Sequence, residues 1–258
     1  MTGKTFTALL LDLDGTIIGP NEGITRSVET AIRRVSEQVP VSIVTGREPY
    51  DVLRFSRQLG LARPQVCDGG ASVLDPATGE YLWRTPIPLE AAREVLAALN
   101  GQSTAFIATH QTGVVTHESH GRGLGEPPDY NRISALDLSR EGAEALAGRF
   151  KGHRQVSVAL AYLPYNTLWA VDFTRTGVNK AAGARKLAEL LGTTLEATAM
   201  VGDSYNDLPL FESCGVRVAM GNAPEEIRTM ADHVAPSVEE DGLAAAIDHY
   251  LLPLLTKK

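Results

Sequence analysis

The sequence predicts an α/β protein in which a Rossmann-like parallel sheet is interrupted by an inserted α+β domain. Strand-like and helix-like segments alternate through the first third of the 258 residues and again after Gly177. Such alternation is typical of a parallel sheet with helices on its faces. Between these parts, pairs of strands follow single helices, which favours an antiparallel sheet. We therefore expect a core domain formed by 1–82 and 177–258, with an inserted domain at 83–176.

The first third begins with an apolar run, Ala8-Leu9-Leu10-Leu11, that predicts a buried strand. An amphipathic helix follows, and a second helix ends at Gly60, a residue suited to a helix C-terminus. The turn-forming residues at 75–79 separate two short strands, as in a hairpin. The expected elements are strand 7–13, helix 25–38, strand 41–44, helix 49–59, strand 64–67 and the hairpin strands 71–74 and 80–84.

In the middle of the chain, a predicted helix–strand–strand pattern occurs twice. A segment rich in Gly and Pro at 118–129 separates the two copies and is expected to be a loop. Antiparallel strands with both helices on one face are the simplest packing for this pattern. The expected elements are helix 88–99, strands 104–109 and 113–117, helix 139–150, and strands 155–163 and 167–173.

After Gly177 the alternation of strand and helix returns. One helix is expected between Asn179, a capping residue, and Gly192. Another begins at Pro224, with two glutamates in its first turn. The expected elements are helix 180–191, strand 197–201, helix 205–213, strand 216–219, helix 224–231 and helix 239–252.

The composition excludes several classes of protein. A formal charge of −7 argues against a general nucleic-acid surface, which would be basic. No apolar run reaches the roughly 18 residues that a membrane-spanning helix requires, and the N-terminus does not resemble a signal peptide. The two cysteines, Cys67 and Cys214, cannot form a disulfide framework. We therefore expect a cytoplasmic protein without nucleic-acid or membrane partners.

Two acids stand at the end of the first expected strand, in the segment Asp12-Leu13-Asp14-Gly15-Thr16. Side chains two residues apart on a strand lie on the same side. Buried carboxylates are costly unless they are paired or bind a cation. Asp12 and Asp14 together could bind a hard divalent metal through oxygen. The same pair could supply a nucleophile and a general acid/base for phosphoryl transfer.

Three further segments supply the other groups that phosphoryl transfer requires. Thr45 ends the second strand of the core, where its hydroxyl and the N–H of Gly46 could bind phosphate. Lys180 begins a helix, so its ammonium adds to the positive end of the helix dipole. Asp203 and Asp207 lie four residues apart at another helix start. With Asp12, they would complete a magnesium site.

These four segments in this order resemble the haloacid dehalogenase (HAD) superfamily of aspartate-nucleophile phosphotransferases. The large insertion between the Thr45 and Lys180 segments resembles the type IIB, Cof-like subgroup of sugar-phosphate phosphatases. The resemblance covers essentially the whole chain and includes two segments near its end, 219–223 and 240–242. It implies a Mg²⁺-dependent phosphatase of a small phosphorylated metabolite. It also implies an inserted cap that closes over the core and selects the substrate.

The resemblance assigns roles to individual residues. It implies that Asp12 forms an aspartyl phosphate and that Asp14 is the general acid/base. It implies that the main-chain carbonyl of Asp14 binds magnesium, together with the side chains of Asp12 and Asp203. Asp207 would bind through water or orient the site. The positions that match the phosphate site are Thr45, Lys180 and Asn206.

Some interpretations stay open at this point. Arg47 could contact the substrate or form a salt bridge. Asp68 stands where the subgroup usually has Asn, which puts in question any substrate contact at that position. A phosphosugar mutase using the same aspartyl phosphate is an alternative function, as is a non-catalytic phosphate-binding regulatory module.

Overall fold

The computed structural model describes residues 4–102, 104–119, 129–163 and 166–255. The chain divides into two compact units. The first unit comprises Met1–Leu82 and Lys180–Lys258, and the second comprises Trp83–Asn179. The sequence interpretation placed the return to the core at 177, three residues before Lys180, where the first unit resumes.

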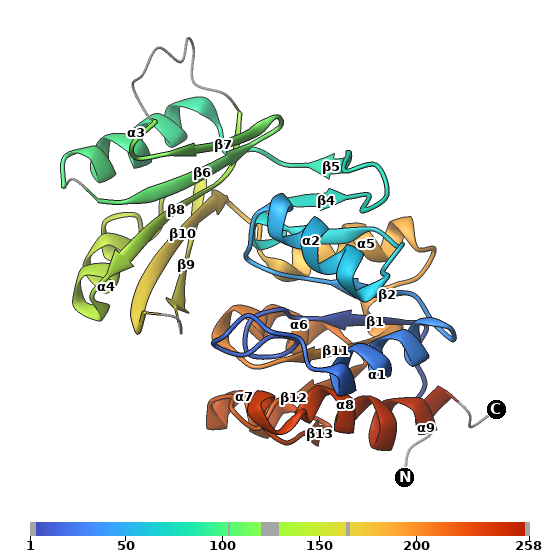
Figure 1. Ribbon diagram of the computed structural model, residues 1–258. Coiled ribbons are helices and arrows are strands. Elements are labelled where there is room, and N and C mark those ends of the chain that lie inside the picture. The colour runs from blue at the N-terminus through green and yellow to red at the C-terminus, as the bar shows by residue number, and fades with distance from the viewer. Residues whose placement is uncertain (1–3, 103, 120–128, 164–165, 256–258) are drawn as a thin grey trace. The chain divides into compact units, whose positions relative to one another are not determined.

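The first unit is built on a five-stranded sheet in the order β13-β12-β11-β1-β2 (Figure 1). All four strand pairs in it are parallel. Leu11, the last residue of β1, pairs with Val201 on one side and Ile43 on the other. The strands are β1 (Ala8–Leu11), β2 (Val41–Ile43), β11 (Thr198–Gly202), β12 (Val216–Ala219) and β13 (His233–Val234).

Helices cover this sheet. Leu9 and Leu11 of β1 pack in one buried cluster with Ile32 of α1 and with Leu243 and Ile247 near the C-terminus. The other two residues of β1, Ala8 and Leu10, are also buried. They face the opposite side of the sheet, because side chains alternate along a strand. The helices of this unit are α1 (Arg26–Ser36), α2 (Pro49–Leu59), α5 (Lys180–Leu190), α6 (Leu208–Ser213), α7 (Glu225–Met230), α8 (Gly242–Ala246) and α9 (Leu252–Leu255).

Two helices predicted as continuous are divided in the structure. The segment 205–213 begins with a 3₁₀ turn, Tyr205–Asp207, before α6. The last helix is divided by a π-helical segment, Ile247–Leu251, between α8 and α9. The sequence pattern indicates only which face of a helix is apolar. A short 3₁₀ or π-helical segment largely keeps that face, so the pattern could not predict where the α-helix is interrupted.

The segment 64–67 is also arranged differently from the expected parallel strand. β3 (Gln65–Cys67) pairs antiparallel with β4 (Ser72–Leu74) in a separate sheet that also contains β5 (Tyr81–Arg84). A parallel bridge from Val44 to Val66 joins it to the end of β2, and the side chain of Gln65 accepts from the N–H of Ile43 at 2.6 Å. The chain turns back after β3 because Asp68 and Gly69 both adopt positive φ.

The second unit contains a five-stranded sheet in the order β7-β6-β8-β10-β9, and its strand pairs are antiparallel. Its core joins both helices to one face of the sheet, with α3 contributing Val95 and α4 contributing Leu146. The elements are α3 (Leu89–Asn100), β6 (Phe106–His110), β7 (Gly113–Thr116), β8 (Tyr130–Leu138), α4 (Arg140–Arg149), β9 (Val156–Leu163) and β10 (Leu168–Arg175).

β8 was missed by the sequence interpretation, which assigned no strand between 117 and 139. The strand contains the charged residues Arg132 and Asp137. Charged residues in this segment favoured a loop over a strand. Arg132 is nevertheless buried, and it forms an ion pair with Asp172 of the neighbouring strand β10. The loop predicted at 118–129 lies largely outside the described residues.

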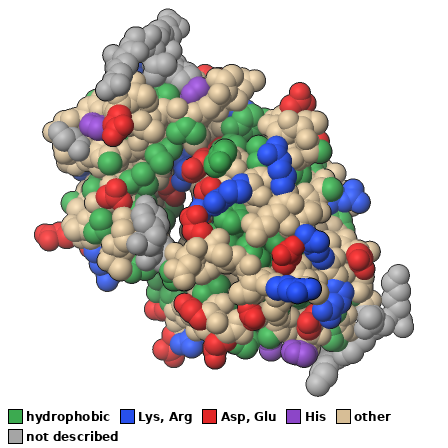
Figure 2. Space-filling model, in the orientation of Figure 1, with side chains coloured by type: hydrophobic (Ala, Val, Ile, Leu, Met, Phe, Trp, Pro, Cys, Tyr) green, Lys and Arg blue, Asp and Glu red, His purple; other side chains and the backbone are tan. Residues whose placement is uncertain are grey.

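Charged side chains of both signs are interspersed over the face of the molecule shown in Figure 2. Among the described residues, no helix combines the length and the apolar character needed to cross a membrane.

Candidate active site

Parallel strands bring the predicted acids to one edge of the first unit's sheet. Asp12 follows β1, and its main-chain N–H donates to the carbonyl of Val201 in β11. Asp203 follows β11 directly. Because β1 and β11 are parallel neighbours, the two carboxylates come from the same edge of the sheet. The ligand oxygens of Asp12, Asp203 and Asp207 lie within 4.8 Å of one another.

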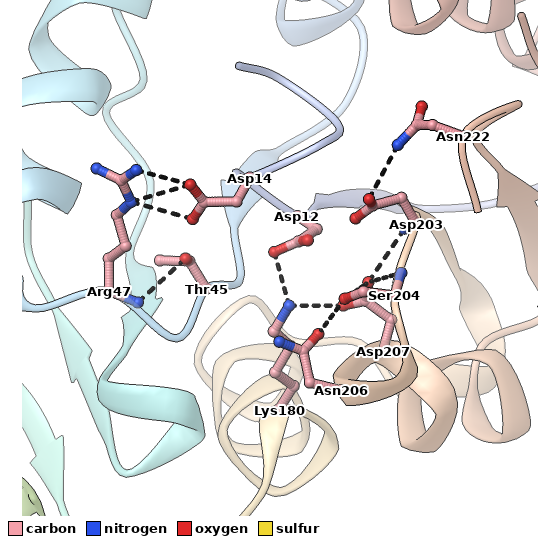
Figure 3. A network of polar contacts seen from close by, with 10 residues as sticks. All are labelled: Asp12, Asp14, Thr45, Arg47, Lys180, Asp203, Ser204, Asn206, Asp207 and Asn222. Carbon is pink, nitrogen blue, oxygen red and sulfur yellow. Dashed lines mark hydrogen bonds and ion pairs between the residues drawn. The ribbon is translucent and has the colours of Figure 1, made fainter. Parts of the chain in front are cut away.

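Lys180 supplies the positive charge at the centre of this acidic cluster. Its Nζ lies 2.6 Å from Oδ1 of Asp12 and 2.7 Å from Oδ1 of Asp207 (Figure 3). The Lys180 side chain is 3% exposed, and those of Asp12 and Asp207 are 4% and 0% exposed. Lys180 is the first residue of α5, as the sequence predicts. In the folded protein its side chain is buried between two carboxylates.

The pKa values of the cluster reflect crowding of like charges. Burial, followed by the charge of Asp207, raises the pKa of Asp12 to about 7, although Lys180 opposes this shift. Burial and the charges of Asp12 and Asp207 raise the pKa of Asp203 well above its usual value. Burial alone would lower the pKa of Lys180, but Asp12 and Asp207 outweigh it and raise that pKa. A single ammonium therefore does not neutralise these acids.

Asp207 has both carboxylate oxygens engaged by the protein. Oδ1 accepts from Lys180, while Oδ2 accepts from the main-chain N–H groups of Asp203 and Ser204 at 3.1 and 3.2 Å. The hydroxyl of Ser204 donates to Asn206 Oδ1 at 2.7 Å. Ser204 and Asp207 also form a capping box across the turn Tyr205–Asp207, in which the side chain of each accepts from the main-chain N–H of the other. Asp207 is thus held in place by its own loop.

Asp203 has one oxygen engaged and one available. Its Oδ2 accepts from the side-chain amide of Asn222 at 2.9 Å. Its Oδ1 is buried and has no hydrogen-bond partner among the described residues. Gly15 packs against this carboxylate so closely that any Cβ there would collide with it. A buried carboxylate oxygen without a donor is costly unless a cation binds it.

The donor set fits a hard divalent cation. Asp12, Asp203 and Asp207 offer only carboxylate oxygens, which Mg²⁺ and Ca²⁺ prefer. The raised pKa values and the available Oδ1 of Asp203 both indicate negative charge that the protein itself leaves uncompensated. We therefore regard this cluster as the candidate metal centre.

Asp14 and Arg47 lie on the other side of Asp12 in Figure 3. The guanidinium of Arg47 contacts both oxygens of Asp14, with the shortest distance 2.7 Å. It also pairs with Glu22 at 2.7 Å and with Asp51 at 2.8 Å. The salt-bridge interpretation of Arg47 therefore describes its contacts in this structure, and a substrate contact stays a prediction.

Thr45 and Gly46 form the turn after β2. Thr45 is buried, and its hydroxyl accepts from the main-chain N–H of Arg47 at 3.2 Å. Its carbonyl accepts from the N–H of Gly69, so the segment around Asp68 supports this turn. The Asp68 side chain is itself buried and accepts from Ser72 at 2.7 Å. Its charge is directed into the protein, toward Ser72.

Sequence reasoning missed several residues that contact the site: Ser204, Asn222, Glu22 and Asp51. A signal existed for Ser204, since Ser followed three residues later by an acid is a capping-box pattern. Asn222 lies in a segment that the family resemblance included without giving it a role. A signal also existed for Asp51, which lies four residues after Arg47, whereas no sequence signal connects Glu22 to Arg47.

Comparison with known proteins agrees with this geometry. A family model described as haloacid dehalogenase-like hydrolase matches residues 9–247. The chain is 26% identical to the pyridoxal phosphate phosphatase YbhA of Escherichia coli, over 96% of this chain and 100% of that protein. It is 27% identical to a phosphoglycolate phosphatase of Methanosarcina acetivorans, over 94% of this chain and 96% of that protein.

A solved structure of a sugar phosphatase of HAD subclass IIB has the same fold. It superimposes with a TM-score of 0.77 at 21% identity, and the match covers 95% of this chain and 98% of that one. The HAD-like fold expected from the sequence is therefore confirmed.

Proposed function

The chain belongs to the haloacid dehalogenase-like hydrolases, and on this premise we propose that it is a magnesium-dependent phosphatase of small phosphorylated metabolites. The observation that carries the proposal is the buried cluster of Asp12, Lys180, Asp203 and Asp207 at the carboxyl end of β1. This arrangement combines a nucleophile, a fixed cation and ligands for a metal, which are the parts that phosphoryl transfer needs.

Asp12 is proposed as the nucleophile. Lys180 holds one of its oxygens at 2.6 Å and so fixes the direction of the carboxylate. Attack of Asp12 on phosphorus forms an aspartyl phosphate and breaks the bond to the leaving oxygen. The hydroxyl of Thr45, the N–H of Gly46 and the ammonium of Lys180 would bind the phosphoryl oxygens, with Asn206 at the edge of this site.

Asp14 is proposed as the general acid/base. It would protonate the leaving oxygen and then take a proton from the water that hydrolyses the aspartyl phosphate. In the structure its carboxylate points toward Arg47 (Figure 3). Asp14 would have to turn away from Arg47 to reach a leaving group bound at Asp12.

Magnesium would be held by the side chains of Asp12 and Asp203 and by the main-chain carbonyl of Asp14, while Asp207 orients the site. When bound, the ion supplies positive charge that offsets the carboxylates and the phosphoryl oxygens. The uncompensated acids described above support this assignment.

The relatives support the proposed substrate class. Their names specify pyridoxal phosphate and phosphoglycolate, which are both small phosphate monoesters. We propose that this chain acts on the same class, including sugar phosphates. No described contact favours a mutase or a non-catalytic module.

The proposal is tested by phosphate release from a panel of monoesters that includes nitrophenyl phosphate, pyridoxal phosphate, phosphoglycolate and hexose phosphates. We expect turnover with Mg²⁺ and none after chelation with EDTA. Borohydride reduction during turnover should convert Asp12 to homoserine, which mass spectrometry detects. Isomerisation of a hexose phosphate without phosphate release would indicate a mutase. Absence of any turnover across the panel would argue for a binding module.

A further inference from the structure

Asn222 connects three segments of the first unit through one side-chain amide. It lies in the turn after β12, where the N–H of Ala223 donates to the carbonyl of Met220. Its Nδ2 donates to Asp203 Oδ2 at 2.9 Å and to the carbonyl of Gly15 at 3.0 Å. Its Oδ1 accepts from the N–H of Val238 at 3.0 Å. Both amide hydrogens and the amide oxygen are therefore used.

The partners of this amide also determine its orientation. Gly15 and Asp203 offer only acceptors to it, and Val238 offers only a donor. The amide nitrogen and oxygen cannot be exchanged without losing all three hydrogen bonds. Asn222 thus has one defined conformation, although its residue is exposed at the surface.

The two carboxylate oxygens of Asp203 have different environments. Asn222 occupies Oδ2, while Oδ1 is buried and has no hydrogen-bond partner in the part of the chain that the structure describes. Gly15 borders the same carboxylate, because a Cβ at that position would collide with it. The Asp203 carboxylate is therefore confined between Asn222 and Gly15, with one oxygen left for another ligand.

We propose that Asn222 is a positioning residue for the metal centre: it fixes the Asp203 carboxylate and the Gly15 turn so that Oδ1 is presented to the cation. This inference rests on the proposed function. Asn222 acts through Asp203 and does not itself contact the metal. Groups that orient metal ligands in this way are worth about 10- to 100-fold in metal affinity.

Residues 236–240 hold the Asn222 side chain from the side opposite Asp203. The N–H of Gly221 donates to the carbonyl of Pro236 at 3.1 Å. Ser237 caps the short turn that begins at Val238, with its hydroxyl 2.8 Å from Glu240 Oε2. The Val238 N–H that holds Asn222 is therefore fixed by its own loop. This gives a role to both segments, 219–223 and 240–242, that the sequence interpretation left without one.

The test measures Mg²⁺ affinity by isothermal titration calorimetry on the intact protein. We expect Asn222→Ala to weaken Mg²⁺ binding about 10- to 100-fold. Hydrolysis of nitrophenyl phosphate should recover to within a few-fold of wild type when Mg²⁺ is saturating. Asn166→Ala is the matched control, because Asn166 donates to Asp137 in the second unit and its loss should leave Mg²⁺ affinity unchanged.

A second pair of variants tests the same link without changing Asn222. Val238→Pro removes the N–H that donates to Asn222, at the first position of a short helical turn, where proline is tolerated. Val238→Ala shortens the side chain and keeps that N–H. We expect weaker Mg²⁺ binding in Val238→Pro and wild-type binding in Val238→Ala.

The outcomes separate this inference from the proposed function. Folded Asn222→Ala with wild-type Mg²⁺ affinity would overturn the positioning role while leaving the phosphatase assignment intact. Loss of the folded state in both Asn222→Ala and Val238→Pro, seen by circular dichroism, would make Asn222 a structural link only and would also overturn it. Wild-type protein that neither binds Mg²⁺ nor hydrolyses any monoester would refute the proposed function itself.

Discussion

Replacing Asp12 with Asn should stabilise the metal-free protein while it abolishes turnover. In the fold, burial and the charge of Asp207 raise the pKa of Asp12 from 3.8 to about 7. At about 1.4 kcal/mol per pKa unit, ionised Asp12 lowers the free energy of unfolding by about 4 kcal/mol near pH 8. Asn removes this charge and can still accept the hydrogen bond from Lys180.

The sign of the pH dependence follows from the raised pKa of Asp12. The folded protein binds this proton more tightly than the unfolded chain does. The contribution of Asp12 to wild-type stability is therefore fully present below pH 3.8 and is lost as the pH rises through about 7. The stabilisation by Asp12→Asn should be about 4 kcal/mol near pH 8 and less than about half of that near pH 5.

The assay is urea unfolding of both proteins in EDTA at several pH values between 5 and 9, followed by circular dichroism. Adding Mg²⁺ should reduce or reverse the difference, since the wild type gains a ligand that Asn binds poorly. A difference in unfolding free energy that stays constant from pH 5 to pH 9 would refute the reasoning. So would near-wild-type turnover by Asp12→Asn.

Three further predictions concern the same site. Asp14→Asn should slow hydrolysis of alkyl phosphates about 10²- to 10⁴-fold, as expected for loss of a general acid, and slow nitrophenyl phosphate less; equal losses for both would contradict the acid role. Lys180→Met should destabilise the metal-free protein by about 3–5 kcal/mol near pH 8 and by less near pH 5, measured by urea unfolding, because it leaves buried carboxylates unpaired. Mg²⁺ at 100 times its Kd should raise the free energy of unfolding by about 2.7 kcal/mol, with Ca²⁺ supporting little turnover; a thermal shift with Mg²⁺ that survives Asp203→Ala would place the metal elsewhere.

The acidic cluster around Lys180 could be predicted because its residues lie next to strong local signals. Asp12 follows an apolar strand, Lys180 starts a helix, and Asp203 ends another strand. Parallel strands then bring these positions to one edge of the sheet. The sequence pattern therefore indicated both the types of side chain and their position at the ends of the strands.

Other contacts depend on details that no local pattern reports. Arg47 was left open between a substrate contact and a salt bridge, because its pairing with Glu22 depends on the path of the loop between β1 and α1. Asn222 reaches Asp203 through a turn whose sequence has no periodic signal. β8 was missed because Arg132 is buried through an ion pair with Asp172, and this compensation is visible only in three dimensions.

The order of strands in the first sheet has a consequence for how the chain is made. β1 has a neighbour on each side. One neighbour, β2, follows soon after it in the chain, while the other, β11, pairs Thr198 with Ala8 across most of the sequence. The five strands of the second unit's sheet come from one continuous stretch, Trp83–Asn179, which is synthesised before β11. The second unit can therefore fold on the ribosome while β1 still has an unpaired edge, since long-range pairing is slow. Pulse-labelled hydrogen exchange during refolding should protect the amides of β8 and β10 before those of β1 and β11.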